Sequence, residues 1–367
     1  MPLILSDEAR MVRESALDFF RERSPITGLR KLRDDNDPDG FSRDLWRQMA
    51  DLGWTGFLVP EDDGGSAFGM TGLAQVMEAA GRTLAATPLL STALLGATLL
   101  SLGGTDDQKA EYLPRLLAGE HIFALALEEG ARHAPNQIAV KATRDGTGYR
   151  LTGQKTFVLD GHIADTLIVA ARTESGITLF LVPGEAATRT RLTMVDSRNA
   201  ALIRLDNVAV GPDAVLGRPD LLDIALDRAR AALAAEMLGS ANEAFDRTIQ
   251  YLKDRKQFGV AIGSFQSLKH RAAQMFCEVE ITRSAVLAAV DALDQNANDA
   301  AALVSLAKAK SNETLYLCSN EGVQMHGGIG MTDEHEIGFF MKRSRVAQAS
   351  FGDTRFCRDR YAQLMGY

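Results

Sequence analysis

Cysteine is scarce in this chain of 367 residues, and its scarcity argues against two kinds of site. The three cysteines, Cys277, Cys318 and Cys357, form an odd set without a C-x-x-C pair. This pattern is unlike a disulfide framework and unlike a thiolate metal centre. We therefore predict no metal site and expect a reducing compartment.

Long apolar runs and an excess of cations are also missing. No apolar run reaches the roughly 18 residues that a membrane-spanning helix needs, so no membrane span is predicted. Lys and Arg number 40 against 48 Asp and Glu, and the net charge of -8 argues against a nucleic-acid partner. The first residues carry neither a basic n-region nor an arginine-rich presequence. We therefore expect a cytoplasmic protein.

Residues 1–120 have the periodicity of helices. Ser6 is an N-cap residue type, and the apolar residues from Val12 to Phe20 after it recur on one helical face. Similar patterns predict helices at residues 41–52, 70–84 and 89–102. The segment 1–120 is therefore predicted to be an N-terminal α domain.

Residues 121–217 have shorter apolar runs, separated by turn residues such as Asp145 and Gly146. Several short strands without helices between them favour an antiparallel β-barrel or sandwich over a doubly wound sheet. The segment 121–217 is predicted to be a middle β domain. Strands are expected at residues 122–127, 137–142, 149–152, 166–171 and 177–182.

Residues 218–367 return to helical periodicity. An apolar stripe extends from Phe265 to Leu293, and Arg283 is the only intrusion. Long stripes of this kind predict a C-terminal four-helix bundle. The whole chain is thus expected to be an α+β multidomain protein of three parts.

Several local sequences, in this order, resemble the acyl-CoA dehydrogenase family of flavoproteins. They are GWTGFLVPE at residues 53–61, DRKQFG at 254–259 and QMHGGIG at 324–330. The resemblance spans essentially the whole chain. It implies FAD as cofactor, an acyl-CoA substrate, and a flavin site shared between subunits of an oligomer.

By the resemblance, one group of residues contacts the flavin. Arg255 ends a helical stretch, where a guanidinium suits a diphosphate but equally suits a surface charge. The glycines of residues 327–330 allow close approach of a ligand, and they equally suit a helix-ending turn. The implied cofactor-binding residues are Leu127, Phe157, Leu159, Arg255, Gln257, Phe258, Gln266, Gln324, Gly327, Gly328 and Gly352.

The proton acceptor of the family is where this sequence departs most. Dehydrogenation needs a carboxylate beside the α-carbon of the thioester. The two positions at which the family carries that Glu hold Phe351 and Ala229 here. Asp353 is the nearest carboxylate, and we predict it as the catalytic base, although it could equally cap the last helix. Arg230 and Phe351 are predicted to lie at the substrate.

The middle domain departs as well. The hydroxyl residues of the family's T-E-P-G-A-G-S-D sequence correspond to Leu127 and His133, and its W-I-T sequence corresponds to residues 157–159. Side-chain donors to the flavin are lost, and we expect weaker FAD binding. The same departures resemble a bacterial subgroup, the small subunits of acyl-CoA or pimeloyl-CoA dehydrogenases, which work alongside a related chain.

The preferred hypothesis is an FAD-dependent acyl-CoA dehydrogenase that introduces a 2,3 double bond into a CoA thioester. It would act as a homo-oligomer or as one half of a heteromer, with electron-transferring flavoprotein as electron acceptor. The second hypothesis is a catalytically silent partner subunit, because both Glu positions are empty. The third is a flavin oxidase or monooxygenase of the same fold.

Overall fold

The computed structural model describes residues 4–218 and 220–367. By their internal contacts these residues form two units. Of the described residues, unit 1 comprises 4–31, 70–85 and 230–367, and unit 2 comprises 32–69, 86–218 and 220–229. Within the described residues, no helix is both long and apolar enough to cross a bilayer.

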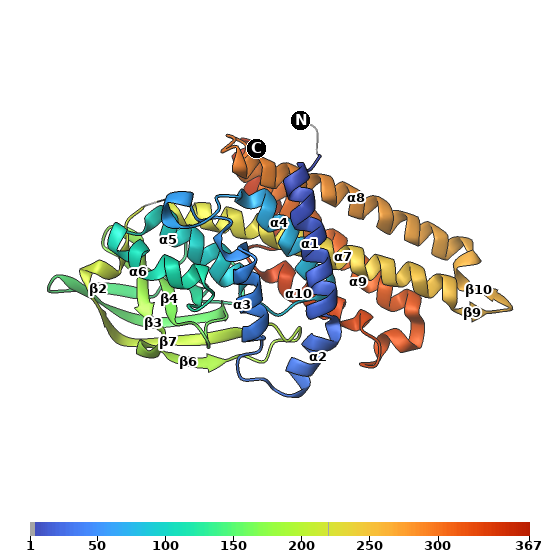
Figure 1. Cartoon of the computed structure of the whole chain (residues 1–367), viewed down its shortest axis with the longest axis horizontal. Coiled ribbons are helices and arrows are strands. Elements are labelled where there is room, and N and C mark those ends of the chain that lie inside the picture. The colour runs from blue at the N-terminus through green and yellow to red at the C-terminus, as the bar shows by residue number, and fades with distance from the viewer. Residues whose placement is uncertain (1–3, 219) are drawn as a thin grey trace. The chain divides into compact units, whose positions relative to one another are not determined.

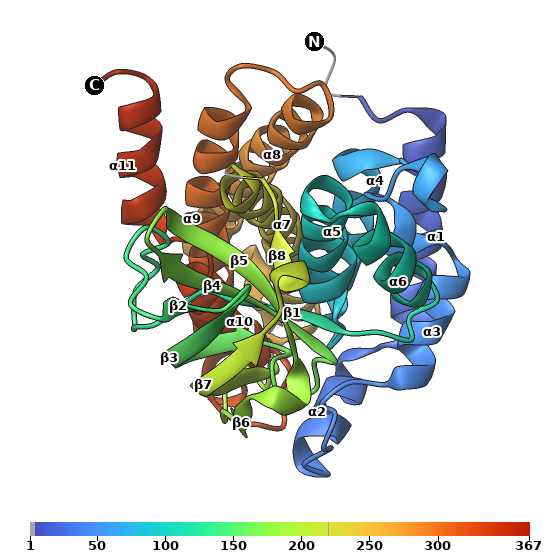
Figure 2. The same ribbon diagram turned by 90° about the vertical axis from the view of Figure 1, so that its left-hand side faces the viewer.

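Unit 1 is helical apart from one small hairpin. Two long helices, α8 and α9, lie side by side, and α11 packs against α9 (Figures 1 and 2). Helix α7 begins in unit 2 and continues into unit 1. The elements are α1 (Asp7–Arg23), α4 (Gly69–Thr83), α7 (Leu221–Asp254), β9 (Lys256–Gln257), β10 (Val260–Ala261), α8 (Gln266–Asp294), α9 (Ala300–His326), α10 (Ile337–Ala349) and α11 (Thr354–Leu364). Helix α2 (Ile26–Asp34) ends in unit 2.

The predicted helix starts and stripes of unit 1 are confirmed. Ser6 caps α1 by accepting a hydrogen bond from the backbone of Ala9, 3.2 Å away. The one intrusion in the stripe, Arg283, donates to Glu78 at 2.8 Å and to Asn242 at 3.1 Å. A side chain that breaks the apolar pattern thus joins α8 to two neighbouring helices by hydrogen bonds.

Unit 2 contains a sheet and the helices that pack with it. The strand order is β6-β7-β3-β2-β4-β5-β8, with β1 paired to β4. The helices are α3 (Arg43–Asp51), α5 (Ala97–Gly103) and α6 (Asp106–Leu117), with a π-helical stretch at Leu89–Gly96. The strands are β1 (Phe123–Ala126), β2 (Lys141–Asp145), β3 (Gly148–Leu159), β4 (Thr166–Thr173), β5 (Gly176–Pro183), β6 (Thr188–Arg191), β7 (Ala200–Val210) and β8 (Val215–Leu216).

The helical, β, helical order is confirmed, but the strands need correction. Residues 137–140 of the predicted strand 137–142 are not in a strand, and β6, β7 and β8 were not predicted. Most strand pairs are antiparallel, as expected, but β1 and β2 each pair with β4 in parallel. The chain reaches β4 from β1 by way of the β2–β3 hairpin, and this long connection permits the parallel pairing. The boundaries predicted at residues 120 and 217 stay a prediction, because the two units group residues by contact rather than by chain order.

Candidate functional site

The predicted site residues fall in both units, and the geometry of each unit is given separately. Leu127, Phe157 and Leu159 belong to unit 2. The remaining ones belong to unit 1: Arg230, Arg255, Gln257, Phe258, Gln266, Gln324, Gly327, Gly328, Phe351, Gly352 and Asp353.

Phe157 lies in unit 2 at an irregular point of strand β3. The pairing of β3 with β7 shifts register between Lys155 and Val158, which indicates a β-bulge. Phe157 has φ of 50°, a left-handed conformation that is unusual for an aromatic residue. The bulge leaves its ring 44% exposed, although Val158 beside it is buried. An exposed ring held by a strained backbone is typical of a ligand contact rather than of a core residue.

A buried lysine holds the segment around Leu127, and the sequence analysis missed it. Lys155 is fully buried, and its Nζ donates to Leu127 O at 3.0 Å and to Glu129 Oε1 at 2.7 Å. Glu129 also accepts from the backbone of Ala139 and Val140, at 2.6 and 2.9 Å. Burial acts to raise the pKa of the Glu129 carboxyl, but these donors outweigh it and lower that pKa. The loop is therefore held by a charged pair.

His133 stands where the family has a hydroxyl residue, and its side chain has another partner. Its ring Nδ1 bonds to a carboxylate oxygen of Glu128, and the side chain is only 2% exposed. Leu127 is buried as well. The loop thus contains no side-chain hydroxyl at either position.

Asp160, three residues beyond Phe157, is a second buried charged group near the bulge. Ser91 Oγ donates to its carboxylate at 2.6 Å, and Asp160 itself has φ of 56°. Burial raises the pKa of the Asp160 carboxyl to about 6. The sequence signal that could have found it is an aspartate directly before Gly161 in a tight turn.

In unit 1, the DRKQFG segment forms the hairpin that follows α7. Arg255 directly follows the end of the helix and is exposed, in agreement with its expected place at a C-terminus. Phe258 and Gly259 form the turn between β9 and β10 with φ of 54° and 81°. The Phe258 ring is 87% exposed. An exposed aromatic ring and a cation on one short hairpin suit the heterocycle and diphosphate of a dinucleotide.

The glycine-rich run lies at the C-terminal end of α9. Gly327 has φ of 64°, and no atom lies within 4 Å of the Cβ position of Gly327 or Gly328. Gln324 is exposed in the last turn of the helix. His326 is buried between Tyr251 and His335, and its Nδ1 donates to Gly322 O at 2.6 Å. The open side of this run is therefore formed by Gln324 and the two glycines.

Residues 350–353 form the turn between α10 and α11, where the family's proton acceptor was expected. Arg230 is 2% exposed, and its Nε donates to Phe351 O at 2.9 Å. Phe351 is buried and has φ of 56°. Asp353 is exposed and caps α11, since it accepts from the backbone of Phe356 at 2.8 Å. The turn thus brings three predicted residues together and gives Asp353 a capping role.

Glu236 is another carboxylate of α7, and it is held by an ion pair. Its Oε1 accepts from Arg343 at 3.0 Å, and both side chains are under 9% exposed. The Glu236 carboxylate is therefore bonded to a side chain of α10 rather than open to a substrate.

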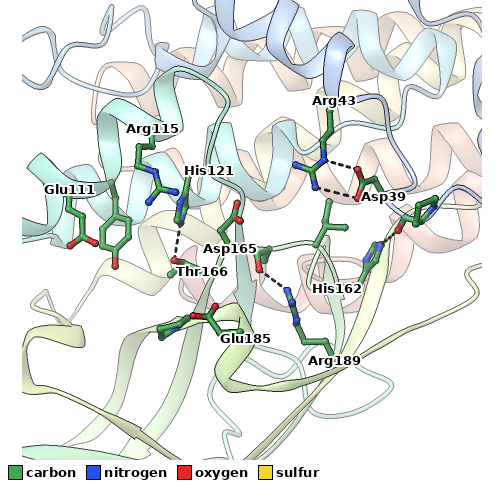
Figure 3. A pocket seen from close by; sticks show the side chains of 15 residues that line it. Asp39, Arg43, Glu111, Arg115, His121, His162, Asp165, Thr166, Glu185 and Arg189 are labelled. Atoms are coloured by element: carbon green, nitrogen blue, oxygen red, sulfur yellow. Dashed lines mark hydrogen bonds and ion pairs between the residues drawn. The ribbon is translucent and has the colours of Figure 1, made fainter.

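A polar pocket of about 570 Å³ lies in unit 2 (Figure 3). Much of its lining is bonded internally: Arg43 donates to Asp39, and Arg189 donates to Ala164 O at 2.8 Å. His121 bonds to Thr166 in the same pocket. Carboxylates outnumber arginines in the lining, and it contains none of the residues that the sequence analysis predicted for the site. The pocket is therefore not the flavin site that the sequence resemblance implies.

The metal-ligating side chains and the cysteines form no further site among the described residues. In the part of the chain that the structure describes, no cluster of three His, Cys, Asp or Glu could hold a metal ion. The three cysteines are free thiols.

The flavin that the sequence resemblance implies fits the residues that are present. The exposed rings of Phe157 and Phe258 suit packing on an aromatic ligand. The positions beside Gly327 and Gly328 are open to a close backbone approach. Arg255 adds an exposed cation for a phosphate group.

Two family models and a relative identify the family of this chain. The family model described as "Acyl-CoA dehydrogenase, N-terminal domain" matches residues 6–120, and the one for the C-terminal domain matches residues 221–365. The chain is 32% identical over 324 residues to acyl-CoA dehydrogenase FadE12 of Mycobacterium tuberculosis, with 83% of each chain covered.

Two similar solved structures contain two different chains. The ChsE4-ChsE5 complex of Mycobacterium tuberculosis has a TM-score of 0.92 at 25% identity, over 100% of this chain and 99% of that chain. The steroid ACAD Tcur3481-Tcur3483 has a TM-score of 0.90 at 30% identity, over 98% of both chains. The chain belongs to the acyl-CoA dehydrogenase family, whose members are FAD-dependent oxidoreductases of fatty acid metabolism.

Proposed function

We propose that this chain is an FAD-dependent acyl-CoA dehydrogenase that introduces a 2,3 double bond into a CoA thioester. The observation that carries the proposal is the 350–353 turn. Buried Arg230 bonds to its backbone, and Asp353 is its only carboxylate. The turn therefore presents one proton acceptor at a fixed place on the segment where the family has its base.

Each part of the reaction has an assigned group. Bound FAD supplies the acceptor for the hydride that leaves the β-carbon. Asp353 takes the proton from the α-carbon, as a general base. Arg230 and Phe351 line the substrate side of the turn. Arg230 acts there through the Phe351 carbonyl, which it holds by a charge-assisted bond.

The cofactor-binding residues divide by the kind of contact they offer. Phe157 and Phe258 offer rings, Arg255 offers a cation, and Gln257, Gln266 and Gln324 offer amide groups. Leu127, Leu159, Gly327, Gly328 and Gly352 offer backbone groups. We further propose electron-transferring flavoprotein as electron acceptor, and the cytoplasm as location.

Anaerobic bleaching of the flavin tests this proposal. The holoenzyme is mixed with octanoyl-CoA, and butanoyl-CoA and phenylpropanoyl-CoA serve as shorter and bulkier probes. Wild type should bleach with one of them, and Asp353→Asn should bleach about 10²–10⁴-fold more slowly, because Asn keeps the shape but loses the proton affinity. Asp359→Asn is the matched control, since Asp359 is exposed on the same helix and bonds to Gln363.

A second candidate is a silent subunit, which supplies half of a shared flavin site to an active chain. It is supported by the capping role of Asp353 and by Phe351 and Ala229 at the two Glu positions. The two-chain complexes among the similar structures support it as well. If wild type bleaches only after a Glu-bearing related chain is added, this candidate replaces the first. Phe351→Glu should then gain bleaching in the isolated chain.

A further inference from the structure

A second buried cation lies under the 350–353 turn. Lys308, in the middle of α9, is fully buried. Its Nζ donates to Asn312 Oδ1 at 2.7 Å, to Ala347 O at 3.1 Å and to Gly352 O at 3.1 Å. An ammonium has three N–H donors, and these three acceptors use all of them.

The acceptors join three separate pieces of chain. Asn312 lies one turn further along α9, Ala347 lies in the last turn of α10, and Gly352 lies in the turn itself. Gly352 has φ of 114°, and a Cβ there would lie 2.5 Å from the Phe356 ring. Lys308 therefore bonds at once to the end of α10 and to the residue directly before Asp353.

We propose that Lys308 is a positioning residue: its buried side-chain amino group, through hydrogen bonds to Ala347 O and Gly352 O, holds the α10–α11 turn in the conformation that places Asp353. The expected effect of Lys308 on the reaction rate rests on the proposed function. Its expected effect on the opening of the turn does not. Lys308 does not touch the reacting atoms. It acts through the backbone carbonyls of Ala347 and Gly352, as Arg230 acts through the carbonyl of Phe351.

The charged groups around Lys308 act on its ammonium charge in both directions. Arg230 of α7 opposes its charge, whereas Asp353 and Cys357 of the α11 segment favour it. On α10, Arg343 lies one turn before Ala347 and is paired with Glu236. Burial is the largest influence, and it lowers the pKa of the Lys308 ammonium to about 8. An opening of the turn that exposed the ammonium to water would restore its ordinary pKa of about 10.4.

Hydrogen exchange measures how readily the α10–α11 turn opens, and it needs no substrate. Lys308→Met should speed exchange in peptides that cover residues 345–357 by about tenfold, because Met leaves the buried carbonyl groups of Ala347 and Gly352 without this donor. Lys310→Met is the matched control. Lys310 lies on the same helix, but it pairs with Glu278. Equal exchange in wild type and Lys308→Met, or equal acceleration in both variants, would overturn the proposal.

The wild-type chain gives a second test, which decides the matter if Lys308→Met does not fold. The open turn binds more protons than the closed turn between pH 8 and pH 10, so rising pH favours the closed form. After correction for intrinsic exchange, protection of residues 345–357 should rise about tenfold from pH 7 to pH 9. A flat protection factor over this range would mean that Lys308 stays buried when the turn opens, which contradicts the proposal.

Flavin reduction tests the kinetic consequence. Lys308→Met should slow bleaching by octanoyl-CoA roughly 10–100-fold, because the base is misplaced. Gly352 is also a proposed flavin contact, so the rates are compared at saturating FAD. If the turn opens more readily in Lys308→Met but the flavin bleaches at the wild-type rate, Lys308 does not position the base. If wild-type holoenzyme does not bleach at all, the proposed function fails, while the two exchange experiments still decide whether Lys308 holds the turn.

Discussion

Among the described residues two lysines are fully buried, one in each unit, and they are held in different ways. Lys155 of unit 2 pairs with the Glu129 carboxylate, so its charge is balanced by a partner in contact. Lys308 of unit 1 bonds to uncharged oxygens. Burial lowers the pKa of both ammonium groups, but Glu129 opposes the shift at Lys155. The two units therefore hold a buried lysine by different means: a carboxylate in unit 2 and neutral acceptors in unit 1.

The two lysines share one feature. Both lysines hold backbone that belongs to a predicted site: Leu127 in unit 2 and Gly352 in unit 1. The chain keeps the backbone in place by buried cations that donate to carbonyl groups.

The largest effect should come from removing the paired lysine. Lys155→Met leaves Glu129 without its cation and should destabilise unit 2 by about 3 kcal/mol or more. The only tryptophans, Trp46 and Trp54, are buried in unit 2, so their fluorescence reports urea unfolding around them in that unit. Lys141→Met, at the exposed first residue of β2, is the control. The double variant Lys155→Met with Glu129→Gln should recover about half of the loss. If the double variant is no more stable than Lys155→Met, the loss of stability does not come from an unpaired Glu129 carboxylate.

Asp160 extends the comparison to a buried carboxylate without a lysine. Its pKa of about 6 lies above the ordinary value, so the folded state holds the proton more tightly and stability falls as pH rises from 4 to 6. Asp160→Asn removes this dependence. Relative to wild type, the variant should gain up to about 3 kcal/mol between pH 4 and pH 7, as measured by tryptophan fluorescence in urea. If Asp160→Asn and wild type differ in stability by the same amount at pH 4 and pH 7, another group causes the pH dependence.

An exposed cation should affect binding rather than folding. Arg255→Ala should weaken FAD binding by roughly 10–100-fold, because one charge-assisted phosphate contact is lost. The melting temperature of the apoprotein should not change, in contrast to the effect of Lys155→Met. Flavin titration and sedimentation check this together. A monomeric wild-type protein with normal FAD binding would contradict a flavin site shared between subunits.

The smallest effect concerns the missing hydroxyl of unit 2. Leu127→Thr should tighten FAD binding about fivefold, since one neutral hydrogen bond contributes about 1 kcal/mol. Leu127 is buried, so the same change should slightly destabilise the apoprotein. His133 is left unchanged because its ring already bonds to Glu128. Unchanged or weaker flavin binding would show that the Leu127 position does not face the cofactor.

Periodicity was enough to predict the order of helices and strands. The helix caps and apolar stripes are local features, and Ser6 and the stripe of α8 lie as expected. The parallel pairs of β1 and β2 with β4 could not be predicted, because strand pairing depends on contacts between residues far apart in sequence.

The buried charged groups were harder to predict. Lys155 and Lys308 were missed because a lysine is rarely buried, and a single sequence does not reveal an acceptor that lies far away along the chain. A signal does exist for Lys308, which interrupts a run of alanine and other small residues on α9. The capping role of Asp353 was weighed as an alternative, since Asp is a favoured N-cap residue.

If Asp353 of this chain accepts the α-proton, as proposed, washout of α-deuterium from the substrate depends on its carboxylate. The holoenzyme is incubated without oxygen with octanoyl-CoA that is deuterated at carbon 2, and loss of deuterium to water is followed by mass spectrometry. We expect washout by wild type and by Asp359→Asn, and a rate about 10²–10⁴-fold lower for Asp353→Asn. Equal washout by wild type and Asp353→Asn, or washout only when a Glu-bearing chain is added, would contradict this proposal.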